Sequence, residues 1–362
     1  MSKICCLLNY PAHYRESIFK LISKNFDVDF YFAEELSNIK KMDVNSLKGY
    51  KGTLRVLKLG NFFFYYNLDK IINRKYTHYI LTGNPWVINN WLVLFYAIFF
   101  KKKVILWSHG FYGKENNIVK KIKKIFFNLA SDVLLYGNYS KNLMIKDGIE
   151  KNKLHVVYNS LDYEKMLYYR KKTSQNNIYI NYFKNNNPVI VYIGRVQTVK
   201  KIDMILYALK YLKKKNENYN FVLIGSKEED IDIDRILIEE NLSDNVWLYG
   251  ACYDESLISS LLYNANVCVS PGNVGLTAIH SLMYGCPVIT NDDFSNQMPE
   301  FEAVVPNKTG LFFMKDNIED LAEKISIICS SKNSFKEDCF KTIDEKYNPE
   351  NQINIIKQVL KN

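Results

Sequence analysis

Two short segments of this 362-residue chain carry residue types that can hold an anion. The first is Gly194-Arg195 followed by Lys200, and the second is the string Ser270-Pro-Gly-Asn-Val-Gly275. Guanidinium and ammonium groups neutralise phosphate oxygens, and glycines let a ligand approach backbone amides closely. Either segment alone could be an ordinary exposed turn. Together they predict a diphosphate-binding site.

Both segments lie where a predicted strand gives way to a predicted helix. The apolar run Val189–Ile193 ends at Gly194, and Val267–Val269 ends at Ser270. After the second run we expect a short helix with Asn273 as N-cap and Gly285 after its C-terminus. Parallel strands end at one edge of a sheet, so the two segments should face each other there, with the helix N-terminus as the anion site.

Strands alternate with helical patterns twice along the chain, which predicts an α/β protein with two doubly wound, Rossmann-like parallel sheets facing a cleft. Residues 166–187 are rich in Tyr, Lys and Asn and predict a linker. The expected domains are therefore 1–165 and 188–348, followed by a terminal helix at 349–362 that can pack back on the first domain.

The first domain offers candidate substrate contacts after two predicted strands. Strand Lys3–Leu8 is followed by the candidates His13, Tyr14 and Arg15, although this loop could also be a plain surface turn. Strand Lys103–Trp107 leads to His109-Gly110. A histidine beside a glycine at the end of a parallel strand is placed for chemistry.

The amino-acid composition limits the kinds of molecule that the protein is expected to bind. The formal net charge of +10 suits nucleic acid, anionic lipid or phosphorylated small molecules, but the chain contains no recognisable nucleic-acid module. Seven cysteines without CxxC spacing predict free thiols in a reducing cytoplasm. The acidic strings 230–234 and 292–293 lie in polar, loop-like stretches, so we expect no metal site.

One apolar helix raises the question of membrane contact. Trp86–Phe100 is too short to span a bilayer comfortably and is followed by Lys101-Lys-Lys103. We expect first a buried helix; the alternative is an interfacial patch with a basic rim that contacts the inner membrane peripherally. A later helical segment with Lys120, Lys121, Lys123 and Lys124 could contact anionic lipid or could simply be solvated.

The second half of the chain resembles the group 1 family of retaining GT-B glycosyltransferases of the bacterial surface-polysaccharide type. The resemblance is strong from about 189 to 325 and weaker, but colinear, at His109 and 159–162. The residues that carry it are Gly194-Arg195, Lys200, Asp203, Gly225, Gly250, Ser270–Gly275, Tyr284–Ile289, Pro299-Glu300 and Thr309-Gly310.

The resemblance implies a metal-independent retaining hexosyltransferase with no cofactor, acting in capsule or lipopolysaccharide synthesis. It implies a nucleotide-sugar donor in the C-terminal domain, UDP-linked first and GDP-linked as the alternative, and a glycan or lipid-linked acceptor in the N-terminal domain. His109, Arg195 and Lys200 would be catalytic. The implied donor-binding residues are Gly194, Arg195, Lys200, Gly272, Asn273, Val274, Gly275, Leu276, Thr277, His280 and Glu300.

The sequence departs from the family at two positions. Where the family has two glutamates bracketing seven residues, this chain has Gly272 and His280. A neutral histidine can still bond ribose hydroxyls, and Glu300 or Glu302 is a candidate replacement carboxylate. The alternatives are therefore a non-catalytic or divergent nucleotide-sugar-binding protein, or a nucleotide-sugar epimerase, which would call for carboxylates near the donor loop.

Overall fold

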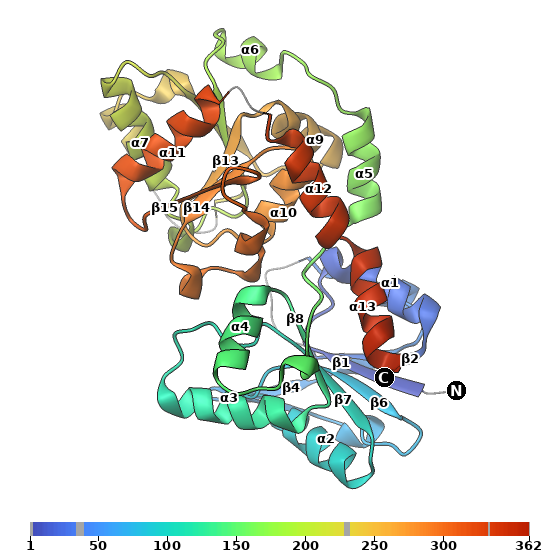
Figure 1. Cartoon of the computed structure of the whole chain (residues 1–362). Coiled ribbons are helices and arrows are strands. Elements are labelled where there is room, and N and C mark those ends of the chain that lie inside the picture. Colours follow the sequence, from blue (N-terminus) through green and yellow to red (C-terminus); the bar gives the residue numbers. More distant parts are fainter. Residues whose placement is uncertain (1–2, 34–39, 228–231, 332–333, 362) are drawn as a thin grey trace. The chain divides into compact units, whose positions relative to one another are not determined.

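The computed structural model describes residues 3–33, 40–227, 232–331 and 334–361. The chain divides into two compact units, Met1–Asp162 with Asn348–Asn362, and Tyr163–Tyr347. Each unit is an α/β structure in which helices pack against a parallel sheet (Figure 1). Among the described residues, none of the helices has the length and apolarity needed to cross a bilayer.

The first unit is built on a seven-stranded parallel sheet in the order β3-β2-β1-β6-β7-β8-β9. Its strands are β1 (Lys3–Leu8), β2 (Asp27–Ala33), β3 (Tyr50–Leu54), β6 (His78–Thr82), β7 (Lys103–Ser108), β8 (Asp132–Leu135) and β9 (Leu154–Val156). A separate antiparallel hairpin joins β4 (Val56–Leu59) to β5 (Phe62–Tyr65). The helices are α1 (Glu16–Asn25), α2 (Ile88–Phe99), α3 (Asn117–Leu129), α4 (Asn138–Lys146) and α13 (Pro349–Lys361).

Both faces of this sheet are buried, as a parallel sheet requires. Along β1, Cys5 and Leu7 point into one core, while Ile4, Cys6 and Leu8 point into the other. The second core also takes side chains from α13, which packs against α1. The C-terminal helix therefore belongs to the first unit, although it follows the second in sequence.

The second unit has a six-stranded parallel sheet in the order β12-β11-β10-β13-β14-β15. Its strands are β10 (Val189–Ile193), β11 (Asn220–Ile224), β12 (Val246–Gly250), β13 (Val267–Ser270), β14 (Val288–Asn291) and β15 (Gly310–Phe313). Its helices are α5 (Tyr163–Lys172), α6 (Ile178–Phe183), α7 (Asp203–Lys214), α8 (Ile233–Glu239), α9 (Glu255–Asn264), α10 (Leu276–Met283), α11 (Ile318–Ser330) and α12 (Lys336–Lys346).

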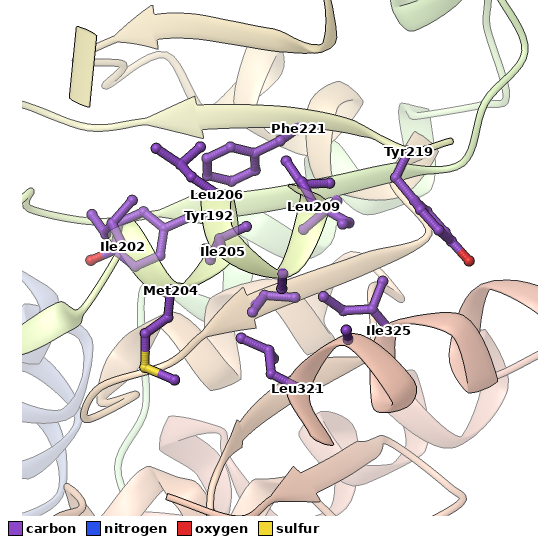
Figure 2. Close-up of a cluster of buried hydrophobic side chains, with 14 of the residues drawn as sticks. Tyr192, Ile202, Met204, Ile205, Leu206, Leu209, Tyr219, Phe221, Leu321 and Ile325 are labelled. Carbon is purple, nitrogen blue, oxygen red and sulfur yellow. The ribbon is translucent and has the colours of Figure 1, made fainter. Parts of the chain in front are cut away.

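A large hydrophobic core fixes the strand ends that carry the candidate site. Figure 2 shows side chains of α7, such as Leu206 and Leu209, packed with Phe221 of β11 and with Leu321 and Ile325 of α11. These side chains are almost completely buried, and each contributes about 1.5–3 kcal/mol by leaving water. The loops at the strand ends are therefore held on a rigid base.

The expected linker at 166–187 is not an extended connection. Most of it forms α5 and α6, and both helices pack against α9 within the second unit. Polar residues of this segment hydrogen-bond to α9. The Thr173 hydroxyl donates to the Ser259 hydroxyl at 2.9 Å, and the Tyr179 hydroxyl donates to the Leu261 carbonyl at 2.6 Å. The prediction was wrong because polar residues that bond to a neighbouring helix have the same composition as a loop.

Strand order reverses once in each sheet. In the second unit, β10 lies between β11 and β13, so the chain crosses to opposite sides after β10. In the first unit the corresponding point lies between β1 and β6. Open α/β sheets bind ligands at the carboxyl ends of the strands at such points. The segments after β10, β13 and β1 are therefore the places to examine for function.

Candidate functional site

The glycine loop after β13 leads into α10, but the helix begins later than expected. Its N-cap is Gly275, with φ +53° and ψ −148°, a conformation that favours glycine. Asn273 does not cap the helix, because its side-chain oxygen accepts a hydrogen bond from Lys200 instead. Gly285 follows the helix with φ +76° and closes it as expected.

Lys200 joins the two segments that the sequence pointed to. Its Nζ donates to the Asn273 carbonyl oxygen at 2.7 Å and to Asn273 Oδ1 at 2.6 Å. Burial and the nearby Arg195 guanidinium lower the pKa of Lys200 to about 8, while the Glu300 carboxylate acts in the opposite direction. The loop after β10 therefore places an ammonium group directly against the glycine loop.

Gly272 has a structural reason to be glycine. A Cβ atom there would lie 2.0 Å from the Val199 carbonyl oxygen and 2.7 Å from Lys200 Cα. Its own amide donates to the Lys200 carbonyl oxygen at 3.0 Å. The Val274 amide is also occupied, because it donates to Gln297 Oε1 at 2.9 Å. These two amides therefore tie the loop to the rest of the protein. That Gly272 and Val274 contact the donor stays a prediction.

The amides that remain are those at the start of α10. Among the described residues, none accepts a hydrogen bond from the amides of Gly275, Leu276 or Thr277, as expected for the first turn of a helix. The Thr277 hydroxyl donates to the Ile193 carbonyl at 2.8 Å, so this turn is fixed to the end of β10. Free amides and the positive end of the helix dipole are the features that favour anion binding, so this turn is the candidate anion site.

A buried polar network that the sequence analysis missed holds the glycine loop. Gln297 is 3% exposed, and its Nε2 donates to the Gly272 carbonyl at 3.2 Å and to Thr290 Oγ1 at 3.0 Å. Asn291 Nδ2 donates to the Pro271 carbonyl at 2.7 Å and the Gly272 carbonyl at 3.0 Å. The polar pair Thr290-Asn291, directly after the apolar run 287–289, was the sequence signal for this network.

Arg195 and Glu300 complete the charged surroundings of Lys200. Arg195 is exposed, and its backbone oxygen accepts a hydrogen bond from the Tyr192 hydroxyl at 2.8 Å. Gly194, before it, lies with φ +148° and leaves room for Tyr192 and Thr277. Glu300 is 3% exposed in a 3₁₀ helix, Pro299–Ala303. The structure thus brings Arg195, Lys200 and Glu300 to the same region as the glycine loop.

His280, in the middle of α10, is engaged by a carboxylate from another helix. Its Nε2 lies 2.9 Å from Glu255 Oε1, and the Tyr284 hydroxyl donates to the same oxygen at 2.6 Å. Burial favours the neutral acid, but the hydrogen bonds from His280 and Tyr284 hold the pKa of Glu255 below its usual value. Glu255 begins α9, beyond the carboxyl end of β12. A carboxylate does exist near this part of the loop, on a residue that the sequence analysis did not single out.

In the first unit, the three candidates after β1 form a 3₁₀ turn, η1 (His13–Arg15), and they differ in exposure. His13 is exposed, with Nδ1 3.1 Å from the Lys40 carbonyl oxygen, and its ring meets the Tyr14 ring edge-on at 5.8 Å. Arg15 is buried, and its guanidinium lies 4.8 Å from the Phe19 ring centre and 4.4 Å from that of Trp107.

His109 follows β7 and sits among aromatic rings. Its ring centre is 4.8 Å from that of Tyr136 and 6.0 Å from that of Tyr112. Burial, with smaller contributions from Arg15 and Lys123, lowers the pKa of His109 to about 4. The imidazole is therefore neutral at neutral pH and can exchange hydrogen bonds with a hydroxyl.

A buried ion pair holds the loop that carries His109. Lys123 Nζ donates to Glu115 Oε1 at 2.6 Å and to the Gly110 carbonyl at 2.9 Å. The other end of this pair is equally anchored, because Glu115 accepts from the amides of Tyr112 and Gly113 at 2.8 and 2.9 Å. Lys123, one of the lysines suspected of contacting lipid, is therefore structural.

Acidic residues do not gather into a metal site in the part of the chain that the structure describes. No group of three or more His, Cys, Asp or Glu side chains there could hold a metal ion. The string 230–234 is only partly described, because Asp230 and Ile231 lie outside the described residues. All seven cysteines are free thiols.

Two parallel α/β units with these strand orders define the GT-B fold. The crystal structure of Anabaena Alr3699/HepE in complex with UDP matches with a TM-score of 0.73 at 14% identity, covering 99% of this chain and 100% of that one. At that identity the match establishes the fold alone.

The sequence of the second unit is similar to that of a known family. Residues 174–342 match the family model of glycosyl transferases group 1. An uncharacterized 41.2 kDa protein in the cps region of Klebsiella pneumoniae is 28% identical over 66% of this chain and 64% of its own length. The capsular polysaccharide biosynthesis glycosyltransferase CapM of Staphylococcus aureus is 27% identical over 59% and 56%. The chain thus spans less than two thirds of the length of these relatives.

Proposed function

We propose that this protein is a retaining glycosyltransferase that moves a hexose from a nucleotide-diphosphate sugar to a glycan or lipid-linked acceptor in bacterial surface polysaccharide synthesis. The observation that carries the proposal is the contact of Lys200 with Asn273, which sets an ammonium group beside the free amides that start α10. The capsule-region relatives support the polysaccharide context.

In this proposal the donor diphosphate lies against the start of α10. Arg195 and Lys200 neutralise its charge, and the amides of Gly275, Leu276 and Thr277 donate to its oxygens. As the bond from the sugar to the phosphate oxygen breaks, the diphosphate leaves with extra charge that these groups stabilise without a metal. The acceptor oxygen bonds to the same face of the sugar, and its proton passes to the departing phosphate. His109 would bond a hydroxyl of the transferred sugar as a neutral imidazole.

The proposed donor is a UDP-sugar, with GDP-sugar as the alternative. HepE, which shares the fold, was crystallised with UDP. The nucleotide test is thermal stabilisation by UDP, GDP, ADP and dTDP. The matching nucleotide should stabilise the protein by about 2–3 kcal/mol at a hundredfold excess over its dissociation constant. Equal shifts with all four would contradict a base-selective donor site.

Catalysis is tested by release of nucleoside diphosphate from radiolabelled nucleotide sugars in the presence of cell-derived glycolipid. Arg195→Ala should lower transfer by about 10²–10³-fold, since it removes one charge from the leaving-group site. Lys214→Ala, an exposed lysine at the end of α7, is the matched control. Full activity in Arg195→Ala would refute the diphosphate site.

A non-catalytic nucleotide-sugar-binding protein is the second candidate, favoured by Gly272 and His280 at the two positions where the family has glutamates. Glu255 weakens this alternative, because it places a carboxylate against His280. Stabilisation by a nucleotide sugar with neither transfer nor sugar isomerisation would support the second candidate. Isomerisation without an acceptor would indicate the epimerase instead.

We also propose that the enzyme works in the cytoplasm and touches the membrane peripherally, through α2. The inner face of the helix buries Val93, Leu94 and Ala97 together with Asn89 and Asn90. The two asparagines bond to Tyr65, Thr82 and Asn84. The outward side chains are apolar, with Phe95 56% and Phe99 79% exposed. The expectation of a fully buried helix was therefore wrong for this face.

Basic and apolar groups around α2 suit an anionic lipid surface. Lys101 follows the helix, and the adjoining hairpin β4–β5 exposes Leu59 and Phe62. Such a surface binds by apolar insertion assisted by charge. The double variant Phe95→Ser/Phe99→Ser should lower binding to phosphatidylglycerol vesicles at least about tenfold. Tyr253→Ser, an equally exposed ring of the second unit, should not. Undiminished binding of the α2 variant would contradict this surface.

A further inference from the structure

Arg15 of η1 is a buried cation with no anionic partner in the part of the chain that the structure describes. It is 8% exposed, yet its guanidinium forms no hydrogen bond or ion pair with any described residue. Removing an arginine from water without pairing it is costly, and buried charges are normally paired or hydrogen-bonded. A buried, unpaired arginine at the edge of a sheet therefore suggests that a ligand supplies the missing anion.

Two aromatic rings hold the Arg15 guanidinium in place, but they do not accept hydrogen bonds from its N–H groups. The Phe19 and Trp107 rings lie 4.8 and 4.4 Å from it, and such contacts return up to about 2 kcal/mol when desolvated. Ring faces do not accept the five N–H groups in the plane of the guanidinium. Nη2 is buried and has no hydrogen-bond partner among the described residues.

Two neighbouring side chains have the same property. Trp107 Nε1 and His109 Nδ1 are also buried polar atoms with no hydrogen-bond partner among the described residues. Trp107 touches Arg15 directly, and Arg15 is close enough to His109 to contribute to its lowered pKa. Three nitrogen-bearing side chains thus gather at the carboxyl ends of β1 and β7 with unmet hydrogen-bonding capacity.

The charged side chains near this cluster do not supply the hydrogen-bond acceptors that it lacks. Lys123, the other cation that acts on His109, is already paired with Glu115. No carboxylate of the described residues pairs with Arg15. Arginine presents a planar fork of donors that matches phosphate oxygens, and an indole N–H adds one donor beside it.

We propose that Arg15 and Trp107, beside His109, form a binding site for a phosphate or diphosphate group carried by the acceptor. Assigning the group to the acceptor rests on the proposed function; the anion site itself does not. Arg15 is then a positioning residue, which fixes the charged end of the acceptor while another part of it reacts. The acceptor class that follows is a sugar linked through phosphate, as in a lipid-linked glycan, rather than a neutral glycan.

The anion site is tested directly by NMR of the indole N–H groups during titration with inorganic pyrophosphate. The chain has four tryptophans, so Trp107→Phe assigns the relevant resonance. We expect a saturable shift of the Trp107 signal that is lost in Arg15→Gln and kept in Arg74→Gln, an exposed arginine of the same unit. The signals of Trp86, Trp91 and Trp247 report whether each variant is folded.

The wild-type titration decides the proposal even if Arg15→Gln fails to fold. No shift of the Trp107 signal at millimolar pyrophosphate would overturn the site. Arg15→Lys is the second variant, which keeps the charge but loses the planar fork, and it should bind pyrophosphate at least about tenfold more weakly. Unchanged binding in a folded Arg15→Gln variant would also overturn it.

The assignment to the acceptor is tested by kinetics with a sugar diphosphate lipid of short chain and the matched neutral glycoside. Arg15→Gln should raise the KM for the phosphorylated acceptor about 10–100-fold and leave the KM for the glycoside and the stabilisation by UDP unchanged. Equal effects on both acceptors would overturn the acceptor assignment while leaving glycosyl transfer intact. A pyrophosphate shift at Trp107 without any transfer would instead sustain the anion site and refute the proposed function. A UDP-induced Trp107 shift that competes with pyrophosphate would assign the site to the donor and overturn the acceptor reading.

Discussion

The Nζ atom of Lys200 donates to both the backbone oxygen and the side-chain oxygen of Asn273, at 2.7 and 2.6 Å. Lys200, which follows β10, thus bonds to the loop that follows β13. The strand order reverses between these two strands. Both acceptors are neutral, so the charge of Lys200 remains available to an anion. The bond fixes where that charge lies before any ligand binds.

The lowered pKa of Lys200 predicts how nucleotide binding depends on pH. Its pKa is about 8, so the ammonium form is lost as the pH rises through that value. The affinity for UDP, measured by calorimetry, should therefore fall between pH 7.5 and about 9.5. Lys200→Arg, which stays charged, should flatten this profile. A profile with the same slope in the variant would show that another group titrates.

The same pKa has a consequence for the stability of the unliganded protein. The folded pKa lies below the unfolded value of 10.5, so between about pH 8 and 10.5 the unfolded state binds more protons at this site. This group therefore lowers stability most below pH 8, and its penalty fades as pH rises through that window. Lys200→Met should raise the free energy of unfolding at pH 7 and lose that advantage towards pH 10.5, as measured by urea unfolding. An advantage that did not depend on pH would contradict this account.

Glycine is required for different physical reasons at positions 272 and 250. A Cβ at Gly272 would strike the Val199 carbonyl oxygen at 2.0 Å, whereas one at Gly250 meets nothing within 4 Å but sits at φ +83°. Gly272→Ala should cost about 2–3 kcal/mol or more and weaken UDP binding, because the loops after β10 and β13 must separate. Gly250→Ala should cost about 1–2 kcal/mol through its backbone alone and leave UDP binding intact. A Gly272→Ala variant with unchanged affinity would contradict the contact.

Much of the fold could be predicted from the sequence, because it depends on local periodicity. Strands such as Val189–Ile193 are continuous apolar runs, and Gly285 ends a helix by its own conformational preference. Asn273 was misassigned as N-cap because Lys200, in the loop after β10 and distant in sequence, donates to its side chain. The Glu255–His280 contact and the role of Gln297 have the same origin: they are set by which strands are neighbours, and spacing along the chain does not encode that.

Glu300 is expected to keep Lys200 charged. Its carboxylate raises the pKa of Lys200 against the effects of burial and Arg195. Glu300→Gln should lower turnover at pH 8 by about tenfold or more, since more Lys200 would be neutral, and the loss should shrink at pH 6.5. Glu302→Gln, two residues along the same 3₁₀ helix, is the control. Unchanged turnover in both single variants would remove both glutamates from the site.

The Glu255–His280 pair is predicted to read the ribose of the donor. With Nε2 of His280 against Glu255 Oε1, the imidazole and the carboxylate together offer hydrogen-bonding atoms that two ribose hydroxyls can use. The wild-type protein should bind UDP more tightly than 2′,3′-dideoxy-UDP by about tenfold, or ~1–2 kcal/mol. Glu255→Gln and His280→Ala should each bring the two affinities together, mainly by weakening UDP. Because Tyr284 also donates to Glu255, Tyr284→Phe serves as the control for simple disruption of this cluster. If calorimetry showed the same preference for UDP in wild type, Glu255→Gln and His280→Ala, the pair would be a structural contact between α9 and α10 and the ribose would be bound elsewhere.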